Sequence, residues 1–250
     1  MIKVDKLYKT FNGESVLENI SVEFEEGKTN LIIGKSGSGK TVLMKSIVGL
    51  LNIDTGDIFY HGRDLILMNI KQKQELRKEM GMLFQGGALF DSLTVEENIR
   101  FPLDMFSNMT EKEKKERINF CLSKVNLENV NEFFPAELSG GMKKRVAIAR
   151  AIVQNPKYLF CDEPNSGLDP MTALVIDKLI SDITHEFNIT TLVNTHDMNS
   201  VMEIGEKIIF LHEGKKEWEG TKEDIFSSDN ENLNDFVFAS NLAKKIKQYL

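Results

Sequence analysis

The sequence lacks the features of a membrane-spanning, secreted or nucleic-acid-binding chain. No stretch approaches the ~18 consecutive apolar residues that mark a candidate transmembrane helix. The N-terminal residues 1–11 have no apolar core of the kind found in a signal peptide. The 31 basic and 38 acidic residues give a net charge of −7, which does not support nonspecific binding of nucleic acid. We therefore expect a soluble, cytoplasmic chain with no nucleic-acid partner.

Cysteine is scarce as well. The two cysteines, Cys121 and Cys161, lie far apart in the sequence, and Cys161 falls within an apolar run. This arrangement is typical of reduced thiols and not of a disulfide framework or a metal site. At 250 residues, the chain has room for one large α/β domain.

One motif that is present is a glycine-rich run, GKSGSGKT, which fits the P-loop pattern G-x-x-x-x-G-K-[ST]. It follows an apolar stretch, 31–33, that predicts a strand, and it opens a predicted helix, 42–51. Glycines allow the positive-φ turns that let backbone N–H groups wrap a phosphate, whereas an ordinary glycine-rich turn would not need this setting. The predicted ATP-binding residues of this run are Gly34, Lys35, Ser36, Gly37, Ser38, Gly39, Lys40, which supplies charge, and Thr41, which ligates Mg²⁺.

Two acidic residues follow a second predicted strand, 158–161. Asp162 and Glu163 would stand at its C-terminal end, where parallel sheets present ligands. We expect Asp162 to hold the Mg²⁺ shell and Glu163 to act as the general base toward water, although an acidic strand end without function is the alternative. A third predicted strand, 189–193, precedes His196, which we expect to contact the γ-phosphate. The surrounding NTHD sequence does not fit the guanine-recognition pattern of GTPases.

The sequence LSGGM, residues 138–142, indicates a helix start that binds an anion. Ser139 is the predicted N-cap, and Gly140 and Gly141 leave helical N–H groups open. Because the P-loop already encloses the phosphates from one side, we expect two copies of the chain to face head to tail. Each ATP would then contact Lys40 of one copy and LSGG of the other, so ATP binding would close the homodimer. Asp169, in SGLD, would cross to the partner.

In this order, the P-loop, LSGG, Asp-Glu, SGLD and the late histidine resemble an ATP-binding cassette (ABC) ATPase over nearly the whole chain. The resemblance implies an α/β fold: a P-loop NTPase, RecA-like core with an N-terminal antiparallel β-subdomain and an inserted α-helical subdomain. It also implies that Phe11 stacks on adenine and that Gln85 joins Thr41 and Asp162 around Mg²⁺. For Phe11, a place in the apolar core is the alternative.

The expected domain organisation is an ABC ATPase domain, 1–227, with its helical subdomain at about 86–155, and a C-terminal tail, 228–250. No second cassette and no long coiled-coil arm is evident, which disfavours the ABC proteins of DNA repair and of the ribosome. Apolar residues at helical spacing predict an amphipathic helix over 234–250. We expect this helix to pack on its own domain or on the dimer partner, with a membrane surface as the alternative.

Two further stretches, 83–103 and 135–152, resemble the ATPase of Mla-type systems, which move phospholipid or other lipids between bacterial membranes. That resemblance implies a membrane permease, an MCE-domain lipid-binding protein and often a STAS-domain protein as partners. It also implies a peripheral place on the cytoplasmic face of the inner membrane. Leu89 and Phe90 would help to dock the permease. The alternatives are another cargo, through lipoprotein release, amino-acid uptake or efflux, and a nucleotide-gated scaffold.

Overall fold

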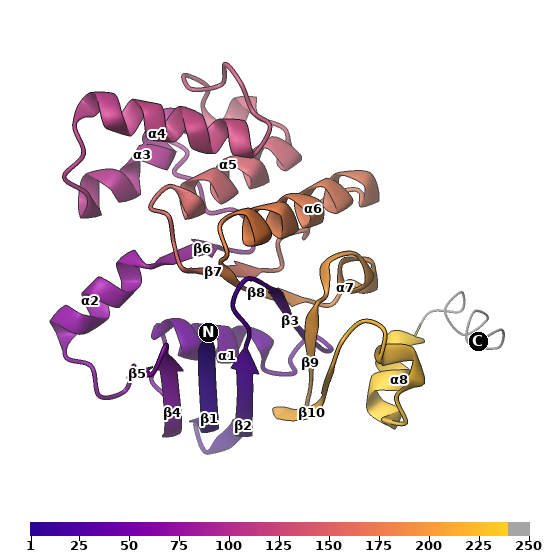
Figure 1. Cartoon of the computed structure of the whole chain (residues 1–250). Helices are drawn as coiled ribbons and strands as arrows, with labels where there is room; N and C mark the ends of the chain where they lie inside the picture. The colour runs from indigo at the N-terminus through magenta and orange to yellow at the C-terminus, as the bar shows by residue number, and fades with distance from the viewer. Residues whose placement is uncertain (240–250) are drawn as a thin grey trace. The chain divides into compact units, whose positions relative to one another are not determined.

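The computed structural model describes residues 1–239, and Figure 1 shows the order of its elements. The chain divides into two compact units. Of the described residues, the first unit comprises 1–25, 29–67 and 194–239, and the second comprises 26–28 and 68–193. Each unit gathers segments that are distant in sequence, and each carries part of the predicted nucleotide chemistry.

The first unit contains a four-stranded antiparallel sheet in the order β2-β1-β4-β5. Its strands are β1 (Ile2–Phe11), β2 (Glu14–Phe24), β4 (Thr55–Tyr60) and β5 (Arg63–Asp64). The turn between β1 and β2 is Asn12-Gly13, with φ angles of 51° and 85°. Positive φ at both positions is the requirement of a type I′ hairpin turn, and Asn-Gly meets it best.

The same unit contains three further strands in the order β10-β9-β3. Strand β3 (Thr29–Ile33) is buried at every position and pairs in parallel with β9 (Lys207–His212), which pairs antiparallel with β10 (Lys215–Gly220). A strand buried on both faces is continuously apolar, which explains the run Leu31-Ile32-Ile33. The helices of this unit are α1 (Lys40–Val48), α7 (Met198–Ile204), η2 (Ile225–Ser227) and α8 (Glu231–Val237).

The second unit contains the strands β6 (Met80–Leu83), β7 (Tyr158–Asp162) and most of β8 (Thr190–Thr195). Strands β6 and β7 pair in parallel. Its helices are α2 (Ile70–Lys78), α3 (Val95–Phe106), α4 (Glu111–Lys124), η1 (Pro135–Glu137), α5 (Gly140–Ile152) and α6 (Pro170–Glu186). Helices α3, α4 and α5 pack on one another (Figure 1).

Two predicted helices differ from the structure. The helix expected over 42–51 begins at Lys40 and ends at Val48, because Gly49 adopts the left-handed conformation (φ 75°) that ends many helices. The helix expected over 234–250 begins at Glu231 instead, and Phe238 is its C-cap residue. The rest of that predicted helix, from residue 240 onward, lies outside the described residues.

Within residues 1–239, no helix has both the length and the apolar character that crossing a bilayer requires.

Candidate nucleotide site

The P-loop connects β3 to α1, and two of its glycines have conformations or surroundings that exclude a side chain. Gly34 has φ 151°, and a Cβ there would lie 2.2 Å from the Leu211 carbonyl oxygen. Gly39 has φ 102°, and its Cβ would lie 2.8 Å from Leu17 Cδ2. The loop therefore passes too close to neighbouring backbone and side chains for any residue but glycine at these two positions.

Lys40 holds the loop closed. Its buried ammonium donates hydrogen bonds to the carbonyl oxygens of Gly34 (2.8 Å) and Lys35 (3.1 Å). Between these anchors, Lys35, Ser36 and Gly37 are exposed. The side-chain oxygen of Ser38 is buried and has no hydrogen-bond partner within residues 1–239. A cation and a buried donor at the base of an exposed loop fit the oxygens of a phosphate group.

Helix α1 begins at this loop. Its N-cap residue, Gly39, has no side chain that could cap the helix, and the first turn holds no acidic residue. The N-terminal N–H groups and the positive end of the helix dipole favour an anion. Thr41, the predicted Mg²⁺ ligand, is half-buried in this first turn. The P-loop thus fits the phosphates of a nucleotide.

The first unit also carries Phe11 and His196. Phe11 is the last residue of β1 and is 41% exposed, with the Lys9 ammonium 5.1 Å from its ring centroid. It does not belong to the apolar core, which was the alternative for this residue. His196 directly follows β8 and is exposed. Two residues earlier, Asn194 is fully buried, and its side-chain amide donates to Met44 Sδ in α1 at 3.6 Å.

The acidic pair follows the buried strand β7 in the second unit. Asp162, the last residue of β7, is 8% exposed, and Glu163 is half-buried with a left-handed φ of 50°. Left-handed geometry in a residue that is not glycine marks a constrained backbone, which is common at functional sites. Burial raises the pKa of the Cys161 thiol that precedes them, so this cysteine stays a neutral part of the core.

Helix α5 begins at LSGG as the sequence predicts, since Ser139 Oγ accepts a hydrogen bond from the Met142 N–H at 3.2 Å. Gly140 is exposed, and a Cβ on Gly141 would lie 2.7 Å from Thr172 Cγ2 in α6. Asp169 is the N-cap of α6. Hydrogen bonds from the hydroxyl and N–H of Thr172 hold the pKa of the Asp169 carboxyl below its ordinary value.

Gln85 is exposed and lies two residues after β6. The segment that follows it is held by side-chain hydrogen bonds that the sequence did not predict. Arg150 in α5 donates hydrogen bonds to the carbonyl oxygens of Gly87 (2.7 Å) and Ala88 (2.8 Å). Asn98 in α3, which is fully buried, bonds to the backbone of Phe90. No local sequence signal joins Arg150 to residues about sixty positions earlier, so only the folded chain reveals its contacts.

A buried lysine near Glu163 was also missed. Lys144 in α5 is 5% exposed, and its ammonium has no hydrogen-bond partner among the described residues. Burial lowers its pKa, while the neighbouring Cys161 and Glu163 act in the opposite direction. Lysine is seldom buried, and nothing in the run MKKR marks its second lysine as the buried one.

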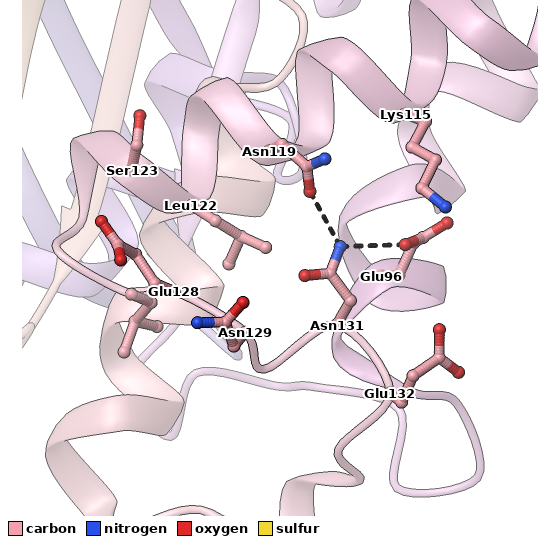
Figure 2. A pocket seen from close by; sticks show the side chains of 10 residues that line it. Glu96, Lys115, Asn119, Leu122, Ser123, Glu128, Asn129, Asn131 and Glu132 are labelled. Carbon is pink, nitrogen blue, oxygen red and sulfur yellow. Dashed lines mark hydrogen bonds between the residues drawn. The ribbon is translucent and has the colours of Figure 1, made fainter.

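The second unit also has a pocket of about 420 Å³ near α3 and α4 (Figure 2). Three of its lining residues are glutamates, Glu96, Glu128 and Glu132, against one lysine, Lys115. Within it, the Asn131 side-chain amide donates to Glu96 and to Asn119, each at 2.9 Å. This excess of carboxylates repels a triphosphate, and none of the predicted site residues lines the pocket.

The predicted Mg²⁺ ligands are the last group of site residues. Among residues 1–239, no group of three or more His, Cys, Asp or Glu side chains is placed to hold a metal ion. The predicted Mg²⁺ set, Thr41, Gln85 and Asp162, offers three oxygens and relies on nucleotide phosphates for the rest, as Mg²⁺ sites commonly do. Oxygen donors of this kind suit Mg²⁺.

A P-loop between a buried strand and an uncapped helix defines a nucleotide-binding P-loop protein. The profile of the family described as ABC transporter matches residues 17–166, and the chain belongs to this family. Its ABC ATPase fold confirms the predicted fold class, and the chain is an ATPase, as predicted.

Individual relatives agree with this assignment. The chain is 41% identical over 229 residues to the methionine import ATP-binding protein MetN of Clostridium tetani, which covers 90% of this chain and 71% of that protein. It is 35% identical over 236 residues to the probable ribonucleotide transport ATP-binding protein mkl of Mycobacterium leprae, with 94% and 68% covered. A dimeric, post-hydrolysis structure of the ATP-binding cassette MJ0796 bound to ADP and Pi matches with a TM-score of 0.80 and 31% identity, covering 88% of this chain and 98% of that one.

Proposed function

We propose that this ATPase powers a bacterial ABC transporter for lipids, of the Mla type, and works as a homodimer bound to a membrane permease. The observation that carries the ATPase role is the closed P-loop, with Lys40 bonded to the Gly34 and Lys35 carbonyls at the open start of α1. The cargo proposal rests on the stretches 83–103 and 135–152, which resemble Mla-type ATPases. Further proposed partners are an MCE-domain protein and a STAS-domain protein.

The proposed roles follow the chemistry of each side chain. The P-loop and Lys40 bind the phosphates, Phe11 stacks on adenine, and Thr41, Gln85 and Asp162 hold Mg²⁺. When bound, this ion neutralises phosphate charge. Glu163 accepts a proton from the attacking water, and His196 donates a hydrogen bond to the γ-phosphate. In the second copy of the chain, the residues that complete the site are Ser139, Gly140, Gly141 and Asp169.

The proposed organisation places the ABC ATPase domain at 1–227, with its helical subdomain at about 86–155, and assigns 228–250 to an assembly tail. In the described part of this tail, Phe236 packs on Phe210 with ring centroids 5.6 Å apart, which supports packing on the chain's own domain. We propose that the protein sits peripherally on the cytoplasmic face of the inner membrane. Truncation after Ser228 should weaken assembly more than it weakens ATP binding.

An apolar surface on the second unit supports a permease contact. Phe90 is 44% exposed and lies against Phe101, with ring centroids 5.0 Å apart. Met105, one turn further along α3, is 58% exposed. Exposed aromatic and methionine side chains are typical of protein interfaces. Leu89 is half-buried, so Phe90 is the stronger candidate of the two residues in the docking hypothesis.

Import of an amino acid is the second candidate cargo, because the chain is 41% identical to the MetN protein of Clostridium tetani. The same ATPase chemistry would then serve another permease. A nucleotide-gated scaffold is a third reading, and the left-handed, half-buried Glu163 argues against it because a scaffold needs no constrained base.

The test of turnover is Glu163→Gln. The variant should bind ATP and dimerise, while its ATPase rate falls by about 10² to 10⁴, the usual contribution of a general base. Glu137→Gln is the matched control, since Glu137 is an exposed glutamate in η1 of the same unit. If Glu163→Gln hydrolyses ATP at the wild-type rate, Glu163 is not the general base. If the wild type is as inactive as Glu163→Gln, the result supports the scaffold.

The test of cargo is purification of the chain from native membranes in mild detergent, with mass spectrometry of proteins and lipids. An MCE-domain protein and phospholipid in the complex support the lipid proposal, whereas an amino-acid permease supports the second candidate. A Leu89→Asp, Phe90→Asp double variant that retains the permease at full yield argues against the docking surface.

A further inference from the structure

Arg150 makes a two-pronged contact with the segment that follows Gln85. Its two terminal nitrogens donate to consecutive backbone carbonyls, Nη2 to Gly87 at 2.7 Å and Nη1 to Ala88 at 2.8 Å. The planar guanidinium suits paired acceptors, whereas a lysine ammonium is a point charge without this fork. Burial lowers the pKa of Arg150 below its ordinary value, and arginine remains a cation, so these carbonyls are important partners for a desolvated charge.

The same segment packs directly on α5. Gly87 is buried, and a Cβ there would lie 3.6 Å from Ala147 Cβ, one helical turn before Arg150. Gly87 and Ala88 have φ angles of 79° and 47°, so the chain turns sharply where the arginine holds it. The Gly87 N–H closes this turn on the Phe84 carbonyl at 2.8 Å, which spans Gln85 itself.

A second anchor holds the far end of the segment to α3. The Asn98 side chain accepts from the Phe90 N–H at 2.8 Å, and its amide donates to the carbonyls of Phe90, Leu93 and Thr94 at 2.9 to 3.1 Å. Between the two anchors lies only Leu89. The irregular segment 85–94 is therefore fixed to two helices that pack on each other and is not a loose connector.

We propose that Arg150 is a positioning residue for Gln85, which it links to the helix that begins at Ser139, so that Gln85 and Ser139 move as one body. The inference rests on the proposed function, in which Gln85 holds Mg²⁺ and Ser139 meets the phosphate of the other copy. It assigns to α5 a second role beyond its N-terminus. Movement of α5 displaces the Mg²⁺ ligand through two hydrogen bonds.

The chain contains a matched control for this arginine. Arg117 in α4 also donates to two consecutive carbonyls, those of Ile152 and Val153, each at 2.8 Å. It holds the C-terminal end of α5, whereas Arg150 holds the Gln85 segment. Replacement of either arginine by lysine keeps the charge and removes the fork, so the pair separates lost stability from lost positioning.

The experiment compares the full-length wild type, Arg150→Lys and Arg117→Lys. We expect Arg150→Lys to exchange the backbone amide hydrogens of 86–90 about tenfold faster, to raise the Mg²⁺ concentration for half-maximal ATPase activity, and to lower kcat about tenfold, because small misplacements are costly in catalysis. ATP affinity measured without Mg²⁺ should stay unchanged. Arg117→Lys should lower the melting temperature with none of these effects. If Arg150→Lys does not fold, Arg150→Gln removes the fork together with the buried charge.

Gln85→Ala separates this inference from the function on which it rests. If Gln85→Ala raises the Mg²⁺ requirement and Arg150→Lys does not, the positioning role is overturned and the Mg²⁺ role of Gln85 stands. If Gln85→Ala leaves the Mg²⁺ requirement unchanged, the proposed role of Gln85 fails and the inference fails with it. Equal changes in Arg150→Lys and Arg117→Lys also overturn the inference, because they indicate a general loss of stability.

Discussion

Helix α1 and the helices α3 and α4 begin in opposite ways. Thr94 caps α3 and Thr110 caps α4, each in a capping box whose glutamate carboxylate accepts the N–H of the threonine at 2.7 to 2.8 Å. Helix α1 begins at Gly39, which has no side chain to offer. The capping boxes supply side-chain acceptors at the starts of α3 and α4, whereas no side chain caps α1. A helix start without a side-chain cap favours an anion.

Helix α5 stands between these cases. Ser139 caps the Met142 N–H, as in α3 and α4, but no acidic residue occupies its first turn. Gly140 and Gly141 add no side chain there, which leaves room for an anion at a helix that is already capped. We expect a helix start that lacks acidic residues and has an adjacent glycine to serve anion binding, at some loss of helix stability.

The largest expected effect is at the P-loop glycine with the closest neighbour. Gly34→Ala places a Cβ 2.2 Å from the Leu211 carbonyl oxygen, so backbone must shift. We expect the free energy of unfolding to fall by about 3 kcal/mol, the upper range for a strained backbone position, together with a loss of ATP binding. Urea denaturation and ATP titration measure the two effects.

Gly37→Ala is the control for Gly34→Ala. Gly37 also has positive φ, 82°, but its Cβ would have no neighbour within 4 Å among the described residues. Only the conformational cost of about 1 to 2 kcal/mol remains. Equal losses in the two variants would mean that steric contact at Gly34 contributes nothing.

Lys40→Ala should weaken ATP binding. It removes the cation at the start of α1, and we expect ATP affinity to fall about 10- to 100-fold, the equivalent of a hydrogen bond to a charged group. The melting temperature should fall as well, because the carbonyls of Gly34 and Lys35 lose the ammonium that donates to them. Isothermal titration calorimetry measures the affinity, and the exposed neighbour variant Lys35→Ala should retain more of it. Unchanged affinity in Lys40→Ala refutes the phosphate role.

The capped helices should show the converse pattern. Thr94→Ala and Thr110→Ala each remove a cap, so each should lower the free energy of unfolding by about 1 kcal/mol. Neither should change ATP affinity. Thermal denaturation and ATP titration of the same samples check both statements. Weaker ATP binding in Thr110→Ala would contradict the separation between structural and ligand-binding helix starts.

The smallest effect concerns the pH dependence of the α4 capping box. Hydrogen bonds from the N–H and hydroxyl of Thr110 lower the pKa of Glu113. A lowered folded-state pKa gives stability that is complete above the ordinary glutamate pKa of about 4.3 and is lost as the pH falls through the lowered value. Glu113→Gln keeps the box but not the charge. Its stability should match the wild type more closely at pH 3 than at pH 7. An equal difference in the free energy of unfolding between Glu113→Gln and the wild type at pH 3 and at pH 7 would contradict this.

The local features of the site follow from the sequence, because each needs only its neighbours in the chain. The strand before the P-loop, the strand before Asp162 and the cap Ser139 all agree with the predictions. The ends of helices were predicted less accurately. Helix α1 ends at Val48, where Gly49 was an available signal, and α8 ends at Val237, in a stretch where apolar spacing alone predicted continuation.

Side chains that bond over long sequence distances, and side chains whose burial depends on packing, could not be found in this way. Arg150 bonds to carbonyls 62 and 63 positions earlier in the chain, and backbone carbonyls carry no residue-specific signal. Asn98 reads as an ordinary polar residue of an amphipathic helix, yet it is fully buried. The burial of Lys144 in a run of basic residues depends on which face of α5 meets the core.

The sequence by itself determined the class of chemistry, because a phosphate-binding loop is a local structure built from eight consecutive residues, 34–41, in which Gly34 and Gly39 leave no room for a side chain and Lys40 supplies the cation. Only the tertiary structure decided which residues hold the segment after Gln85, that Phe11 is exposed and that Lys144 is buried. These features depend on which surfaces meet after folding, and burial and hydrogen-bond partners are properties of that packing and not of the residue types.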